Sequence, residues 1–206
     1  MRTETVGVTE TLIESAKKEF LEHGFQNANL RRISSESGVS MGSIYTRFGD
    51  KAGLFSAVVK PAADGLMELY LESITAARES GDPAEATSQG NEGTELVLKY
   101  IYENFDVFKL IFCHSAGTEY ERYFDELAEI EEKYYREFVK QFSRRENMVS
   151  DFFIHVICRT GWSYIYEVVS HDLSYDEAQI FMKSIREFCF AGWGKVLGQN
   201  YEDLGL

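Results

Sequence analysis

Residues 37–51 read SGVSMGSIYTRFGDK, and this stretch decides how the amino-terminal part of the chain folds. Gly38 supplies a turn residue, and Ser40 can cap a helix over 41–48. In that helix Ile44 and Phe48 are four residues apart and can both pack inward. The small, polar and basic residues between them are left on an open surface that a helical corner does not require.

The segments on either side of this corner have helical patterns of their own. Apolar residues recur at helical spacing over 9–23, where Gly24 provides the stop, and an Asn cap precedes a short helix over 30–37. A long helix begins at residue 51, and Pro61 predicts a kink or a break in it near residue 60. We therefore expect an amino-terminal domain over 1–60 and a larger helical domain over 61–206.

The composition indicates a globular, all-α chain of about nine helices. The 206 residues are 44% hydrophobic, include two prolines and show no convincing strand alternation. The polar, glycine-containing segment 79–93 predicts a loop. Further helices are expected over 95–105, 106–114, 118–145, 151–170 and 174–197.

Charge is distributed unevenly along the chain. The net charge is −13, yet residues 1–60 hold eight Lys and Arg against seven Asp and Glu, and the acidity belongs to the remainder. The first part can therefore still meet phosphates. Three widely spaced cysteines and the lack of a secretory signal or a bilayer-spanning run predict a cytoplasmic protein away from the membrane.

Three short helices with Gly38 in the turn between the second and third form the layout of a helix-turn-helix unit, whose recognition helix enters the major groove of DNA. Gly42 allows close backbone approach, Ser43 and Thr46 can bond a phosphate or a base edge, and Arg47 can reach guanine or phosphate. Arg47 could instead pair with Asp50.

Residues 9–59 resemble the DNA-binding domain of the tetracycline-repressor (TetR) family. The resemblance covers about a quarter of the chain. It rests on Gly-Phe after the first helix, the inward Ile33, Gly-Val-Ser at 38–40, Gly-x-Ile-Tyr-x-x-Phe at 42–48 and Lys-x-x-Leu-Phe at 51–55.

The resemblance implies a double-stranded, pseudo-palindromic DNA operator as partner and assigns roles to matching positions. Tyr45 and Lys51 match phosphate contacts, although Tyr45 could also be a core-edge tyrosine with its hydroxyl in water. Ser34 and Ser37 stand where the family usually has alanine, and position 41 is apolar where a polar or basic residue is commoner. The candidate DNA-binding residues are Arg31, Ser40, Met41, Gly42, Ser43, Tyr45, Thr46, Arg47 and Lys51.

The resemblance also implies a helical regulatory domain that forms a homodimer through its last two helices and often encloses an effector. Apolar and small residues on those helices form stripes broader than one neighbour needs, which favours a two-fold interface. The candidate interface residues are Phe153, Ile157, Gly161, Tyr164, Phe181, Ile185, Phe188 and Gly192.

Aromatic residues of the second domain could line a cavity for a small-molecule effector that is lipophilic or cationic. Aromatic residues at helical spacing also occur as plain core. The candidate ligand-binding residues are Phe105, Phe108, Phe112, Tyr134, Trp162 and Tyr166.

Catalytic, cofactor and metal signatures are lacking in the sequence. There is no nucleophile elbow, phosphate loop or dinucleotide fingerprint, so we expect neither an enzyme nor a cofactor. His155 and Cys158 lack a zinc-site spacing, so no metal site is predicted. The sequence thus predicts a DNA-binding repressor released by a small molecule. The alternative is a helix-turn-helix protein whose second domain binds a protein partner.

Overall fold

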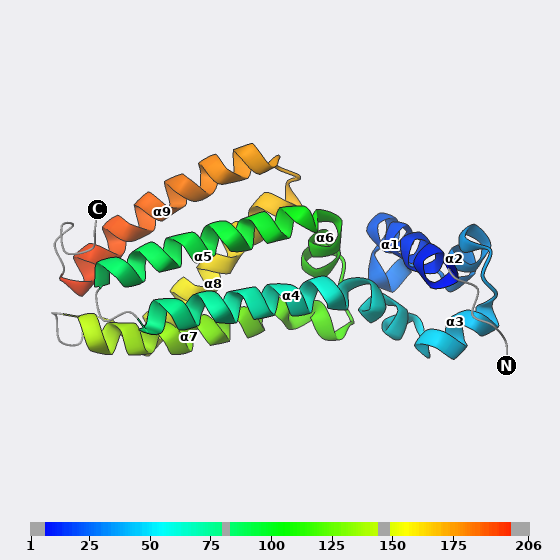
Figure 1. Ribbon diagram of the computed structural model, residues 1–206, viewed down its shortest axis with the longest axis horizontal. Helices are drawn as coiled ribbons and strands as arrows, with labels where there is room; N and C mark the ends of the chain where they lie inside the picture. The colour runs from blue at the N-terminus through cyan, green and yellow to red at the C-terminus, as the bar shows by residue number, and fades with distance from the viewer. Residues whose placement is uncertain (1–6, 80–82, 144–148, 199–206) are drawn as a thin grey trace. The chain divides into compact units, whose positions relative to one another are not determined.

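The computed structural model describes residues 7–79, 83–143 and 149–198. Over these residues it contains nine α-helices, one short 3₁₀ helix and no strand, so the all-α prediction is confirmed (Figure 1). The elements are α1 (Val8–Asn27), α2 (Leu30–Ser37), α3 (Met41–Phe48), α4 (Lys51–Glu79), α5 (Pro83–Glu103), α6 (Phe105–Cys113), η1 (Glu119–Arg122), α7 (Tyr123–Phe142), α8 (Asp151–Ser170) and α9 (Tyr175–Leu197).

The chain divides into two compact units. The first unit is Met1–Gly65 with Asn104–Tyr123, and the second is Leu66–Glu103 with Phe124–Leu206. The first unit is thus larger than the expected domain over 1–60, because α6 and η1 belong to it as well.

The first unit has an aromatic core between α1 and the start of α4. Phe20 and Phe55 are fully buried and meet edge to face with ring centroids 5.0 Å apart. The inward residues predicted for the short helices, Ile33 and Ile44, are also fully buried. Burying each of these side chains contributes about 1.5–3 kcal/mol to folding.

Glycines and caps set the boundaries of the first three helices. Gly24 has φ 67° and ψ 166°, which interrupts the helical geometry of α1 three residues before its end. Gly38 ends α2 in the left-handed conformation, with φ 69°, which glycine adopts without strain. Asn29 and Ser40 accept hydrogen bonds at the starts of α2 and α3.

Hydrogen bonds and an ion pair attach α6, and residues on either side of η1, to the rest of the first unit. The amide of Phe25 donates to the carbonyl of His114 at 2.9 Å, and Lys17 pairs with Asp106 at 3.4 Å. The hydroxyl of Tyr123 donates to the carbonyl of Ala63 at 2.6 Å. These links explain why the first unit reaches beyond the helix-turn-helix segment.

Of the kink or break predicted near residue 60, the break is wrong, since α4 runs as one helix from Lys51 to Glu79 with Pro61 inside it. Pro61 is exposed, whereas Ala62, Ala63 and Leu66 are buried. Their packing outweighs the one helical hydrogen bond that a proline removes.

The predicted loop over 79–93 is wrong for residues 83–93, and residues 80–82 lie outside the described part of the chain. Helix α5 begins at Pro83, where a missing backbone N–H is tolerated because the first turn has no partner for it. Gly93 is buried, and a Cβ there would lie 2.8 Å from the Cβ of Ser73 on α4. Close packing of two helices therefore overrides the polar, glycine-containing composition.

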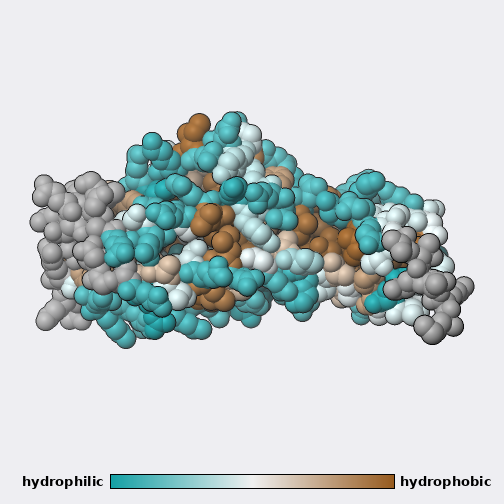
Figure 2. Space-filling view, in the orientation of Figure 1, coloured by the Kyte–Doolittle hydropathy of each residue, from teal (hydrophilic) through white to brown (hydrophobic). Residues whose placement is uncertain are grey.

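The second unit is built from the later part of α4 and helices α5, α7, α8 and α9. The expected helix over 118–145 is divided into η1 and α7. The side chain of Glu132 is buried and bonds to Arg136 at 3.0 Å and to His155 at 2.8 Å. On the face shown in Figure 2, apolar residues interrupt the hydrophilic surface of this unit.

Candidate functional sites

Helix α3 turns Ile44 into the core and leaves the opposite side open. Gly42, Tyr45 and Thr46 are exposed, with the side chain of Tyr45 at 51%, and Met41 is half-buried. The open side of α3 thus carries Gly42, Tyr45 and Thr46, whereas Ser43 and Arg47 are half-buried like Met41. We call Met41, Gly42, Ser43, Thr46 and Arg47 the reading face.

Arg47 lies against the start of α1 rather than against Asp50. Its Nη1 donates to Oγ1 of Thr9 at 2.7 Å, and its Nε donates to Oγ of Ser43 at 3.3 Å. Asp50 instead accepts from the amide of Gly53 at 2.8 Å, which caps α4. A DNA base would thus compete with these hydroxyl partners for Arg47.

Two other members of the candidate set have mainly local partners. The hydroxyl of Thr46 donates to the carbonyl of Gly42 at 2.7 Å, and Ser40 caps α3 by accepting from the amide of Ser43 at 3.2 Å. A Cβ added to Gly42 would meet no atom closer than 4.0 Å, so packing within the chain does not require glycine there.

Lys51 is held at the end of α1. Its Nζ donates to the carbonyls of Gln26 at 3.0 Å and Ala28 at 3.2 Å, and it lies 4.7 Å from the ring centroid of Phe25. A cation at this position satisfies carbonyls that a helix leaves without partners. The residue that sequence matching assigned to phosphate therefore also has a structural role.

The two arginines of α2 differ. Arg31 is exposed and has no ion-pair partner among the described residues, which leaves it available to DNA. Arg32 donates from Nε to both carboxylate oxygens of the buried Glu19 at 2.9 Å. Burial raises the pKa of Glu19, but hydrogen bonds from Arg32 and from the amide of Asn29 outweigh it and hold the pKa below its usual value.

The serines that depart from the family pattern hold the turn between α2 and α3. Oγ of Ser34 donates to the carbonyl of Val39 at 2.6 Å, and Oγ of Ser37 donates to the carbonyl of Ile33 at 2.7 Å. The amide of Val39 donates to Oγ of Ser37 at 3.3 Å. The two serines therefore stabilise the turn through their hydroxyl groups and their position next to its backbone.

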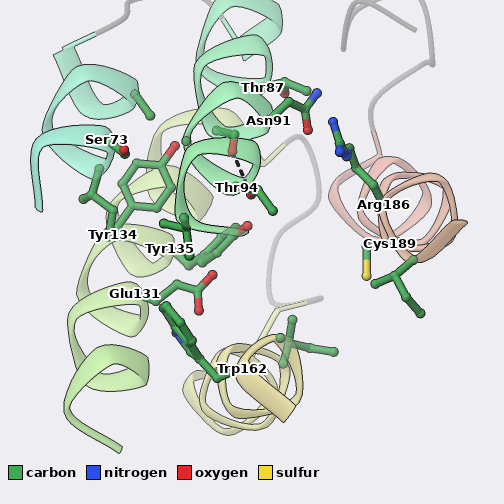
Figure 3. Close-up of a pocket in the computed structure, with 18 of the residues that line it drawn as sticks. Ser73, Thr87, Asn91, Thr94, Glu131, Tyr134, Tyr135, Trp162, Arg186 and Cys189 are labelled. Carbon is green, nitrogen blue, oxygen red and sulfur yellow. Dashed lines mark hydrogen bonds between the residues drawn. The ribbon is translucent and has the colours of Figure 1, made fainter. Parts of the chain in front are cut away.

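The second unit contains a cavity of about 270 Å³ between α4, α5, α7, α8 and α9 (Figure 3). Its walls are mostly apolar and aromatic, and both tryptophans of the chain, Trp162 and Trp193, line it. Two charged residues, Glu131 and Arg186, are also in the lining. Figure 3 shows Glu131 close to Tyr135 and Trp162, with Arg186 lying near Asn91 on the far side.

Burial favours the neutral forms of the acidic groups that line the cavity. Burial raises the pKa of Glu131 to about 8, and the side chain of Trp162 offsets part of this rise. Burial also raises the pKa of Tyr134 to about 12 and that of Tyr135 well above its ordinary value. At neutral pH the carboxyl of Glu131 is therefore mostly protonated and the two phenols are intact.

Only part of the predicted ligand-binding set meets this cavity. Tyr134 and Trp162 line it, whereas Tyr166 does not and is 37% exposed. The other three, Phe105, Phe108 and Phe112, lie on α6 in the first unit and do not line it. Phe108 is fully buried there, which fits the plain-core alternative.

The predicted dimer residues fall into three groups. Phe188 is 72% exposed and Gly192 is exposed. Phe153 packs edge to face on Trp193, and Phe181 does so on Tyr164. The remaining members are half-buried and line the cavity: Ile157, Gly161, Tyr164 and Ile185.

The candidate set left out the exposed apolar residues one position away on the same two helices. Phe152 is 75% exposed, Val156 is 42% exposed and Ile180 is 70% exposed. The i, i+4 spacing of Phe152 and Val156 was a usable signal. Glu131 and Arg186 gave no signal, because single charged residues on helices are most often solvated.

The two residues weighed as zinc ligands do not form a metal site. Both ring nitrogens of His155 have protein partners, Glu132 at 2.8 Å and Arg159 at 3.2 Å. Within the described ranges no group of three His, Cys, Asp or Glu residues is arranged to hold a metal ion. No helix in those ranges combines the length and hydropathy needed to cross a bilayer.

Residues 12–58 match the model of the tetR family of bacterial regulatory proteins. Over 62 residues the chain is 37% identical to the HTH-type transcriptional repressor AcnR of Corynebacterium glutamicum. That alignment covers 30% of this chain and 33% of the repressor, so the match spans about a third of the length of that relative.

Two solved structures have the same fold over nearly the whole chain. PfmR, a TetR-family regulator from Thermus thermophilus, has a TM-score of 0.64 at 18% identity and covers 92% of this chain and 95% of its own. FadR from Bacillus subtilis, in complex with stearoyl-CoA, has a TM-score of 0.57 at 14% identity, with coverages of 86% and 95%.

Proposed function

Since the chain belongs to the TetR family of transcriptional regulators, we propose that it is a repressor that binds operator DNA and is released by a small molecule. The observation that carries this proposal is the open surface of α3. There, a buried Ile44 is followed directly by an exposed Tyr45, and Gly42 and Thr46 lie open beside it.

Helix α3 suits the major groove because its reading face carries a glycine and two hydroxyl side chains, with one apolar residue at Met41 and one charge at Arg47. Gly42 permits close approach, while Ser43 and Thr46 supply hydroxyls at its side. Tyr45 and Arg31 are exposed next to it and serve as phosphate contacts, which fix the register of the protein on DNA.

We propose that the functional form is a homodimer that joins through α8 and α9. Phe188 and Ile180 on α9 and Phe152 and Val156 on α8 expose large apolar surface, which a second copy would cover. A two-fold axis requires the two reading faces to meet grooves one helical turn, about 34–36 Å, or a multiple apart. The operator would therefore be a pseudo-palindrome.

The cavity in the second unit supports a small molecule as the effector. A ligand that binds one conformation more tightly than another shifts the population, and it releases DNA when the favoured conformation spaces the two reading faces wrongly. The alternative, a protein partner in place of an effector, relies on the exposed apolar residues of α8 and α9. Those residues are equally explained by the second copy, so the cavity favours the effector.

The test is selection of bound genomic fragments followed by fluorescence anisotropy on the selected DNA. Tyr45→Phe should weaken specific and random DNA alike by about threefold to tenfold, because a phosphate hydrogen bond is lost. Its folding stability should not change, because the hydroxyl has no partner among the described residues. Selection of no DNA, or unaltered affinity in both Tyr45→Phe and Arg31→Ala, would contradict the proposal.

A further inference from the structure

The two charged residues that line the cavity are not equivalent. Nη1 of Arg186 donates to the carboxylate of Glu95 at 2.9 Å, so its charge is already paired, although its buried Nε completes no hydrogen bond with a described residue. Glu131 has no ion-pair partner among the described residues, and no lysine or arginine contributes to its pKa. When Glu131 ionises, it is therefore an acid without a counter-charge.

The surroundings of Glu131 are aromatic. Tyr70 and Trp162 meet edge to face with centroids 5.0 Å apart, and Tyr135 stacks on Trp193 at the same separation. Figure 3 places the carboxyl of Glu131 close to Tyr135 and Trp162. The indole Nε1 of Trp162 is buried and completes no hydrogen bond with a described residue.

We propose that this cavity binds a lipophilic organic cation, whose positive charge meets the carboxylate of Glu131 and whose body packs against the aromatic walls. Ring faces attract cations, most strongly where water is excluded, and a buried carboxylate is stable once it is paired. An anionic ligand would face Glu131 at one end and an arginine that is already paired at the other. The inference rests on the proposed function, because it names the chemical class of the effector.

Binding of a cation is coupled to a proton on Glu131. The other titratable groups that face this carboxyl are phenols and thiols whose pKa values burial raises, and α5 adds no titratable group to the lining. These groups are Tyr70 of α4, Tyr134 and Tyr135 of α7, Cys158 of α8 and Cys189 of α9. Arg186 of α9 stays charged throughout.

The direction of the pH dependence follows from the raised pKa of Glu131, about 8. Below that pH a proton must leave before the cation can pair, so affinity for a permanent cation rises with pH, by at most about tenfold per pH unit. Above it the affinity levels off. A neutral ligand has no such dependence.

The experiment follows tryptophan fluorescence, because both tryptophans line the cavity. The full-length protein is titrated at pH 8.5 with benzyltrimethylammonium, with its uncharged carbon isostere neopentylbenzene and with phenylmethanesulfonate. Glu131→Gln should weaken the cation at least tenfold and leave the neutral isostere unchanged. Glu129→Gln, which removes an exposed charge from the same helix, is the matched control and should leave all three affinities unchanged.

Equal cation affinity in the wild type and Glu131→Gln would overturn the inference. The inference would also be overturned if the protein bound phenylmethanesulfonate more tightly than the cation and if Arg186→Gln abolished that binding. If Glu131→Gln does not fold, the wild type alone decides: its affinity for the cation should rise more than tenfold from pH 6.5 to 8.5, and a flat profile would overturn the inference.

The readouts keep this inference separate from the proposed function. Operator affinity is measured by anisotropy on the same samples. DNA binding that is insensitive to Tyr45→Phe and Arg31→Ala contradicts the proposed function and leaves the cation site standing. A fluorescence titration that is insensitive to Glu131→Gln contradicts the cation site and leaves DNA binding standing.

Discussion

The ammonium of Lys51 at the start of α4 donates a hydrogen bond to the carbonyl of Gln26 at the end of α1, over 3.0 Å. Lys51, at the start of α4, thus supplies a hydrogen-bond donor to the end of α1. It also faces the ring of Phe25 at 4.7 Å, which adds a cation–π contact.

Lys51→Ala should therefore lower stability as well as DNA affinity. We expect a loss of about 1–2 kcal/mol in the free energy of unfolding, measured by urea titration, because two carbonyls lose a charged donor. Lys60→Ala, which removes an exposed charge from the same helix, should change it by less than about 0.5 kcal/mol. An unchanged urea midpoint for Lys51→Ala would show that its contacts contribute nothing to folding.

The pair of Glu19 and Arg32 should make stability depend on acid. The folded-state pKa of Glu19 lies below the ordinary value of 4.5, so the pair stabilises the fold above about pH 4.5 and this contribution is lost as pH falls through the folded-state pKa. Glu19→Gln should cost about 2 kcal/mol at pH 7. The gap to the wild type should narrow in urea titrations below pH 4.5.

The control for this prediction is Glu22→Gln, since Glu22 lies on the same helix and its side chain is 75% exposed. Glu22→Gln should change the free energy of unfolding very little at pH 7 and at low pH. A gap between Glu19→Gln and the wild type that is the same at pH 7 and at low pH would contradict the assignment to Glu19.

Substitution of Gly42 distinguishes an effect on folding stability from an effect on DNA recognition. Replacing a helical glycine with alanine stabilises a helix by about 0.5–1 kcal/mol, and a methyl group at this position meets no close neighbour. Gly42→Ala should therefore raise the melting temperature while it weakens operator binding at least fivefold, because the methyl group obstructs the groove. A variant with a raised melting temperature and unchanged operator affinity would mean that the backbone of α3 does not approach DNA at this point.

The exposed Phe188 should determine the oligomeric state. Phe188→Asp places a charge where we propose that the second copy packs, so sedimentation should change from dimer to monomer with the circular dichroism spectrum unchanged. Leu71→Asp on α4, where the leucine is 44% exposed, is the control and should remain dimeric. A dimer that survives Phe188→Asp would place the interface elsewhere.

The local part of the fold could be predicted from sequence because its determinants are close neighbours along the chain. Gly24 interrupts the helical geometry of α1, and Gly38 ends α2. Asn29 and Ser40 begin α2 and α3 by accepting hydrogen bonds from amides two or three residues later. The helix at 83–93 could not be predicted in this way. Its stability comes partly from packing of Gly93 on Ser73, which is twenty residues away in sequence.

The sequence could predict which helix faces carry the candidate sites, but it could not predict which groups of other helices contact them. Periodicity identifies the apolar sides of α8 and α9, yet it cannot distinguish a side chain that lines a cavity, such as Ile157, from one that faces solvent, such as Val156. Both are apolar and adjacent. The roles of Lys51 and Glu131 depend on groups from other helices, which no short-range pattern encodes.

The hydroxyls of Ser34 and Ser37 satisfy backbone groups at the corner between α2 and α3. The corner is therefore preorganised: its conformational entropy is lost during folding, not during encounter with a partner. Alanine at these positions, as in the usual family pattern, would leave that ordering to the main chain. In this protein two side-chain oxygens order the turn that leads into α3 before any partner binds.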